Sequence, residues 1–112
     1  MHRAPITTHV LNLDTGKPAA GISVCLCAGR SCEPIAKATT DSDGRIVQWD
    51  SEFTLSTGDY RLSFAVSEWF ALQSRSCFYS EITLSFSVNA VDEHYHVPLL
   101  LNAYGYSTYR GS

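Results

Sequence analysis

Apolar and polar residues alternate with a period of two through most of this chain. The alternating runs are short, rich in β-branched and aromatic residues, and separated by Gly, Pro, Asp and Asn. Such a pattern is typical of half-buried strands divided by turns. It predicts eight strands, at residues 6–13, 22–28, 35–40, 45–49, 60–66, 82–88, 94–101 and from 106 to the carboxyl end.

One segment, residues 67–73, departs from this alternation. Ser67 can cap a helix, Glu68 places an acid in the first turn, and the segment contains neither Gly nor Pro. We therefore predict a single short helix there. Eight strands and one helix in 112 residues predict one all-β domain over residues 1–112, a two-sheet antiparallel β-sandwich rather than a barrel, with the strand order left open.

The predicted architecture restricts where a ligand can bind. The core of a sandwich lies between sheets about 10 Å apart and is filled by side chains, so no deep internal cleft is expected. A small-molecule site is therefore predicted at the mouth of the sandwich or between subunits.

Charge and hydropathy exclude two classes of partner. Eleven acidic side chains against eight basic ones give a net charge of −3, and Lys and Arg never form a run, which argues against nucleic acid. Met1 is followed by polar residues and Pro5, and no apolar stretch is long. Neither a secretion signal nor a membrane span is expected.

The four cysteines, Cys25, Cys27, Cys32 and Cys77, allow two interpretations. Without a secretion signal we expect free thiols that pack as small hydrophobic side chains, with Cys25 and Cys27 on one face of a strand. A zinc site made by Cys25, Cys27, Cys32 and a histidine is the weaker alternative, because the paired C-x-x-C spacing is absent.

Two of the four histidines lie near the amino end. His2 is expected to be solvated. His9 shares a strand face with Thr7 and Leu11, and an isolated histidine there is more often structural or exposed than functional. Arg45 follows the turn at residues 41–44 and stands at the head of a strand, a position that is also common for a surface arginine.

The other two histidines, His94 and His96, lie on one face of the strand at 94–101, and Pro98 and Leu100 continue that face. For His94, which follows two acidic residues, we favour a solvated position. Pro98 cannot donate to a strand ladder, so we expect this strand at an edge or a bulge. Spacing alone predicts no site.

Five separated segments of the chain make the pattern more specific. The chain ends on Tyr109-Arg110-Gly111-Ser112, preceded by His-Tyr-His-Val-Pro-Leu-Leu at 94–100. The amino-terminal part contains Thr-Thr-His-Val-Leu at 7–11, Gly-Lys-Pro-Ala at 16–19 and Asp-Gly-Arg at 43–45. In this order, over nearly the whole chain, these motifs resemble the 5-hydroxyisourate hydrolases, a transthyretin-like family. The implied fold is the transthyretin-like (prealbumin-like) β-sandwich.

The resemblance implies an enzyme of urate degradation to allantoin. Its substrate is 5-hydroxyisourate, whose N1–C6 amide bond is opened by water to give 2-oxo-4-hydroxy-4-carboxy-5-ureidoimidazoline. An imidazole suits the base, for which His9 and His96 both remain candidates. Arg45 would stabilise the oxyanion and the new carboxylate, and Ser112 would orient rather than attack.

The resemblance also implies the remaining members of the site. The catalytic set is His9, Arg45, His96 and Ser112. Substrate is held by His9, Arg45, Tyr109, Arg110, Gly111 and Ser112. Neither a metal nor a cofactor is expected, because the substrate is already electrophilic. The implied assembly is a homotetramer with the site between subunits, and the expected compartment is the cytoplasm, with the peroxisome as the alternative.

Other readings remain open. A non-catalytic, transthyretin-like ligand carrier is the main one, because residues 104–108 also resemble transthyretin, but transthyretin lacks the two site histidines, the arginine and the terminal tetrapeptide. A plain adhesion or regulatory sandwich domain is a third. The chain departs from the hydrolases at Asn12, where Asp is common, at Ala103, where Pro is common, and in the cysteine-rich stretch 25–32.

Overall fold

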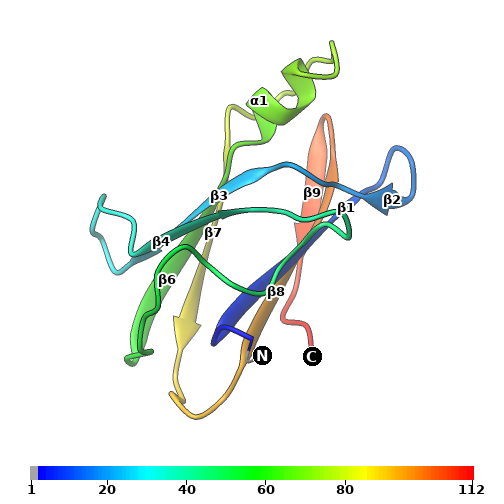
Figure 1. The fold of residues 1–112 in the computed structure, drawn as a ribbon. Coiled ribbons are helices and arrows are strands. Elements are labelled where there is room, and N and C mark those ends of the chain that lie inside the picture. The colour runs from blue at the N-terminus through cyan, green and yellow to red at the C-terminus, as the bar shows by residue number, and fades with distance from the viewer. Residues whose placement is uncertain (1–2) are drawn as a thin grey trace.

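Two β-sheets, one of five strands and one of four, face each other in the computed structural model, which describes residues 3–112 (Figure 1). The expectation for His2 therefore lies outside the described residues. One sheet has the order β2-β1-β8-β9, with β5 also paired to β1, and the other has the order β4-β3-β6-β7. The elements are β1 (Ile6–Asn12), β2 (Lys17–Pro18), β3 (Ser23–Ala28), β4 (Ala36–Thr39), β5 (Arg45–Ile46), β6 (Gly58–Phe64), α1 (Val66–Ala71), β7 (Ile82–Val88), β8 (Tyr95–Asn102) and β9 (Gly105–Thr108).

The alternating pattern accounts for the core. Every second side chain of the long strands points between the sheets, where apolar burial supplies the main stabilisation. The large side chains that are fully buried come from both layers and from α1: Phe64, Phe70, Ile6, Ile22, Leu26, Ile46, Leu62, Ile82, Leu99, Leu101, Val10 and Val24. Figure 1 shows α1 at one end of the sandwich, beyond the ends of the strands.

The predicted all-β sandwich with one short helix is confirmed, and most strand bounds agree within one or two residues. The strand predicted at 45–49 is shorter, because β5 covers only Arg45–Ile46, and β2 was not predicted. The proposed cap is wrong. The helix starts at Val66 after the N-cap residue Ala65, which makes no side-chain capping bond, so Ser67 lies inside it.

One pairing breaks the antiparallel rule. β1 and β8 run parallel, with Ile6 opposite Tyr95 and Asn12 opposite Leu101. Their connection contains the whole second sheet, which is long enough for the crossover that parallel neighbours require. This pairing brings the amino-terminal and carboxyl-terminal motifs together.

The expectation that Pro98 marks an edge strand or a bulge is wrong, because β8 lies between β1 and β9 and the register is the same on both sides of Pro98. The β8–β9 register, continued from Leu99 opposite Thr108, places Pro98 opposite Tyr109, where β9 has ended. The ladder is therefore interrupted at the residue that has no N–H to donate. It resumes at a bridge between His96 and Gly111.

All four cysteines are free thiols in the described chain. Cys27 is buried, Cys25 and Cys77 are half-buried and Cys32 is exposed. Among residues 3–112, no group of three or more His, Cys, Asp or Glu side chains is placed to hold a metal ion. No helix in this range is long and apolar enough to cross a membrane.

Candidate active site

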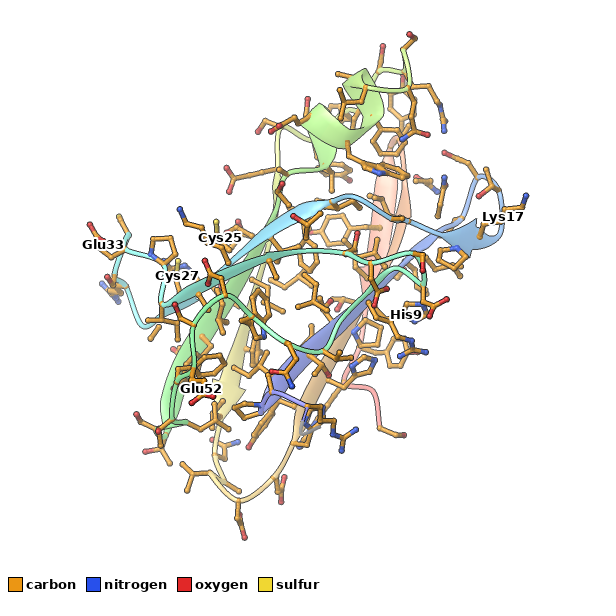
Figure 2. The ribbon with its side chains drawn as sticks, viewed as in Figure 1. His9, Lys17, Cys25, Cys27, Glu33 and Glu52 are labelled. Atoms are coloured by element: carbon orange, nitrogen blue, oxygen red, sulfur yellow. The ribbon has the colours of Figure 1, made fainter. Side chains whose placement is uncertain are left out.

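The parallel pairing of β1 with β8 places two histidine-bearing segments side by side. Thr7 lies opposite His96, and His9 lies opposite Pro98. Because side chains alternate along a strand, Thr7, His9 and His96 share the outer face of their sheet. Figure 2 shows His9 on the side of the molecule away from Cys25 and Cys27, which belong to the other sheet. We call this outer surface of β1 and β8 the histidine face.

A tight turn delivers Arg45 to the same face. The carboxylate of Asp41 accepts hydrogen bonds from the backbone N–H groups of Asp43 and Arg45, at 2.9 Å each. Gly44 has φ +74°, and a Cβ there would lie 2.4 Å from the carbonyl oxygen of Val10, so the turn requires glycine. β5 then pairs antiparallel with β1, which places Arg45 directly opposite His9.

The last residues of the chain return to His96. The backbone N–H of Gly111 donates to the His96 carbonyl at 2.8 Å. A Cβ at Gly111 would lie 2.6 Å from His96 Cδ2 and 3.1 Å from Pro98 Cγ, so only glycine fits against the imidazole. Ser112 follows and is exposed next to this contact. The structure thus brings His9, Arg45, His96 and Gly111 together, with Ser112 as the next residue of the chain.

Thr7 and His94, which no sequence motif marks as site residues, lie against His96 and extend this group of side chains into a histidine cluster. The buried hydroxyl of Thr7 lies 2.8 Å from His96 Nδ1 and 2.9 Å from His94 Nε2. The expectation that His94 is simply solvated is therefore wrong, since its ring is half-buried and hydrogen-bonded. The sequence does place Thr7 on the same strand face as His9. This points to a role for Thr7 only once β1 is known to pair with β8.

Burial and positive charge both favour neutral imidazoles here. For His96, burial lowers the pKa, and Arg45, His94, His9 and Arg3 lower it further. For His9, burial and then Arg45 lower the pKa, while a hydrogen bond with the Asp43 backbone and the carboxylates of Asp41 and Asp43 partly oppose this. A pKa below the usual value near 6.5 leaves the rings uncharged at pH 7, with a lone pair available to accept a proton.

The surface can therefore do a defined kind of chemistry. It offers neutral imidazoles as proton acceptors, a guanidinium to stabilise negative charge, and a chain end beside them. The model of the HIUase/Transthyretin family matches residues 6–111. The chain belongs to the HIUase/transthyretin family.

Relatives within this family agree over nearly the whole chain. The 5-hydroxyisourate hydrolase of Caulobacter vibrioides is 42% identical over 113 residues, covering 96% of this chain and 97% of the relative. The solved structure of the Klebsiella pneumoniae 5-hydroxyisourate hydrolase is 34% identical, with a TM-score of 0.85 and coverage of 96% and 98%. Transthyretin from Sparus aurata has a TM-score of 0.83 at 23% identity, with 97% of each chain covered, and this likeness shows the fold alone.

Two departures from the family pattern have a clear local structure. Asn12 is buried, and its Oδ1 accepts the backbone N–H of Asp14 at 3.0 Å, so the amide itself holds the first turn. Ala103 is buried and its carbonyl accepts the N–H of Phe78 at 2.8 Å. Neither residue lies on the histidine face, so neither disturbs the cluster.

Among the described residues of the single chain, no hydrogen bond or ion pair joins Tyr109 or Arg110 to His9, Arg45 or His96, although Arg110 reaches the backbone of His94. The Arg110 guanidinium lies 4.3 Å above the ring of Tyr95, forms an ion pair with Glu93 at 3.0 Å and donates to the His94 carbonyl at 3.1 Å. Tyr109 and Arg110 line a separate cavity of about 440 Å³ at the edge between β7 and β8. Their assignment to substrate stays a prediction.

Proposed function

We propose that this chain hydrolyses 5-hydroxyisourate to 2-oxo-4-hydroxy-4-carboxy-5-ureidoimidazoline. The observation that carries the proposal is the meeting of His9, Arg45, His96 and the Gly111–Ser112 end on one sheet face, through the β1–β8 and β1–β5 registers. The relatives named as 5-hydroxyisourate hydrolases support it. An ultraviolet assay that follows the decay of freshly oxidised urate tests it directly.

The reaction needs a base for water and a cation for the attacked oxygen. His96 or His9 accepts a proton from water, and the resulting hydroxide oxygen attacks C6 of the substrate. The C6 oxygen gains negative charge, which the Arg45 guanidinium stabilises, and collapse of the adduct breaks the N1–C6 bond while N1 takes up the proton. The new carboxylate can then accept two hydrogen bonds from Arg45.

Ser112 follows Gly111, whose backbone donates to the His96 carbonyl, and it carries a hydroxyl and, in the 112-residue chain, a carboxylate. Both groups can accept a hydrogen bond from the attacking water or from a protonated imidazole, so we assign Ser112 an orienting role. No step requires a metal or a cofactor, because the substrate carbonyl is electrophilic and the base is an imidazole.

The fork geometry of Arg45 gives a first test. Arg45→Lys keeps the charge but loses the planar pair of donors, so we expect kcat/KM to fall about ten- to hundredfold, the value of one or two charged hydrogen bonds. Thermal stability should hardly change because Arg45 is exposed. Steady-state kinetics beside a thermal melt make the comparison, and a lysine enzyme as fast as the wild type would show that charge alone suffices.

The histidine face is open in the single chain, which supports a homotetramer. Leu11 and Leu100 are half-buried on it, and Leu13 and Val47 at its margin are 46% and 40% exposed. Apolar surface of this kind around polar catalytic groups is typical of a subunit interface. Packing of two such faces would enclose substrate between subunits, which a sandwich with a filled core cannot do within one chain.

The tetramer gives a second test. Light scattering should report a mass of roughly four times the 12.3 kDa of the chain. Dilution below the assembly range should abolish turnover together with the tetramer. A fully active monomer would contradict this placement of the site.

We further propose a cytoplasmic location for the enzyme.

A ligand carrier of the transthyretin type is the competing function. It would bind in the same place without turnover, and it gives no role to the neutral imidazoles beside Arg45. Saturable binding of 5-hydroxyisourate without any acceleration of its decay would favour the carrier.

A further inference from the structure

Resting on the proposed hydrolase function, we infer that Thr7 and His94 are positioning residues that fix the tautomer of His96 and so make its Nε2 the base of the reaction. The carrying observation is the pair of contacts from one hydroxyl, Thr7 Oγ1, to His96 Nδ1 at 2.8 Å and to His94 Nε2 at 2.9 Å. Thr7 is only 3% exposed, so solvent does not compete for this hydroxyl.

The Thr7 hydroxyl must donate a hydrogen bond to one of the two rings and accept a hydrogen bond from the other. A threonine hydroxyl has one proton to donate and lone pairs to accept. Within the part of the chain that the structure describes, the two ring nitrogens are its only hydrogen-bond partners. Because a buried hydroxyl proton without an acceptor is costly, one ring accepts from Thr7 and the other donates to it.

The requirement that His96 act as a base selects the direction of the two hydrogen bonds at Thr7. To accept a proton on Nε2, a neutral His96 must carry its own proton on Nδ1, which then donates to Thr7 Oγ1. The Thr7 hydroxyl in turn donates to His94 Nε2, and His94 keeps its proton on Nδ1. Nδ1 and Nε2 lie on different edges of an imidazole, and Cδ2, next to Nε2, is the atom against which Gly111 packs. The free nitrogen of His96 thus lies on the edge toward the chain end.

We call the two hydrogen bonds that run from His96 through Thr7 to His94 the relay. His94 can accept the last hydrogen bond of the relay only while its ring is neutral. Burial lowers the pKa of His94, and the charges of Arg3 and Arg110 lower it further. Arg110 is held there by its bond to the His94 carbonyl and by Glu93. Arg110 of the terminal tetrapeptide thus adds to burial and Arg3 in lowering the pKa of His94, a contribution that requires no contact between Arg110 and the substrate.

The relay also acts after the proton has moved. When water gives its proton to His96 Nε2, the ring becomes an imidazolium, and its Nδ1–H bond to Thr7 becomes charge-assisted and stronger. The bond thus stabilises the charged state formed during the reaction more than the neutral ground state. Removing the hydroxyl should therefore lower kcat more than it changes KM.

The test compares Thr7→Val, which keeps the shape and removes the hydroxyl, with Thr7→Ser, which keeps the hydroxyl. We expect Thr7→Val to lower kcat about tenfold with KM within about twofold, and Thr7→Ser to retain kcat within about threefold. Thr8→Val is the matched control. Thr8 donates to the Val97 carbonyl at 2.6 Å and is fully buried, away from the histidines, so its loss should lower thermal stability but not kcat.

A spectroscopic readout tests the tautomer without substrate. Nitrogen NMR of the histidine-labelled protein should show His96 protonated on Nδ1 in the wild type and in Thr7→Ser, and a mixture of tautomers in Thr7→Val. Wild-type His96 protonated on Nε2, or equal loss of kcat in Thr7→Ser and Thr7→Val, would overturn the relay. If the wild type showed the expected tautomer but no turnover of 5-hydroxyisourate, the proposed function would fail while the relay stood.

Discussion

Replacing His96 with asparagine is expected to lower kcat for 5-hydroxyisourate by at least about a hundredfold, the usual value of a general base. The ring is held by two contacts, the Thr7 hydroxyl at Nδ1 and the Gly111 backbone against Cδ2, which fix its position on the histidine face. KM should change little, because in the proposed mechanism it is Arg45 that holds the substrate. Steady-state kinetics by ultraviolet absorbance make the measurement.

The fold should survive this substitution. His96 is half-buried on the outer face of its sheet and does not belong to the hydrophobic core, so thermal melting and assembly mass should match the wild type. A stable His96→Asn tetramer with full kcat would remove His96 from the mechanism and leave His9 as the remaining base.

The second large effect is expected at the carboxyl end. In the 112-residue chain, appending a few residues after Ser112 converts its carboxylate to a neutral amide and adds bulk directly after Gly111, which contacts His96. If Ser112 has the proposed orienting role, kcat should fall at least about a hundredfold, as when a group that handles the reacting proton is lost. An ordinary sandwich domain tolerates such additions at its ends. The same tag placed before Met1 is the matched control and should leave turnover within about twofold.

Both tagged proteins should keep the melting temperature and the assembly mass of the untagged chain, because Ser112 is exposed and contributes nothing to the core. Cleaving the carboxyl-terminal tag back to Ser112 should restore the rate. Equal turnover of the two tagged proteins would contradict the role given to Ser112.

Local patterns predicted the elements well, for reasons that residues 58–64 illustrate. Tyr60, Leu62 and Phe64 are buried and alternate with half-buried Arg61 and Ser63, so the period of two follows from one face packing on the core. The same reasoning placed His9 and His96 on strands with the correct facing. Their proximity came from the family resemblance and not from periodicity.

The missed features depend on pairing between distant strands. Thr7 and His96 are separated by 89 positions, and nothing local in either strand indicates that they meet. The role of His94 was misjudged for this reason, because its partner lies at the other end of the sequence. Pro98 was misplaced because its missing N–H matters only opposite Tyr109, where the ladder is interrupted. The orientation of the Arg110 side chain likewise depends on a contact with another strand, because its guanidinium packs over the ring of Tyr95.

The parallel pairing of β1 with β8 also has a consequence for biosynthesis. A ribosome releases β1 first, and its neighbour β8 emerges only after the whole β3–β7 region. Contacts of such long sequence separation form late and slow the folding of β-rich domains. The edge of β1 that faces β8 therefore stays unpaired until synthesis is nearly finished. During this period the nascent chain is most exposed to strand-mediated aggregation. Catalytic competence and protection from misassembly are thus acquired together, in the final step of folding.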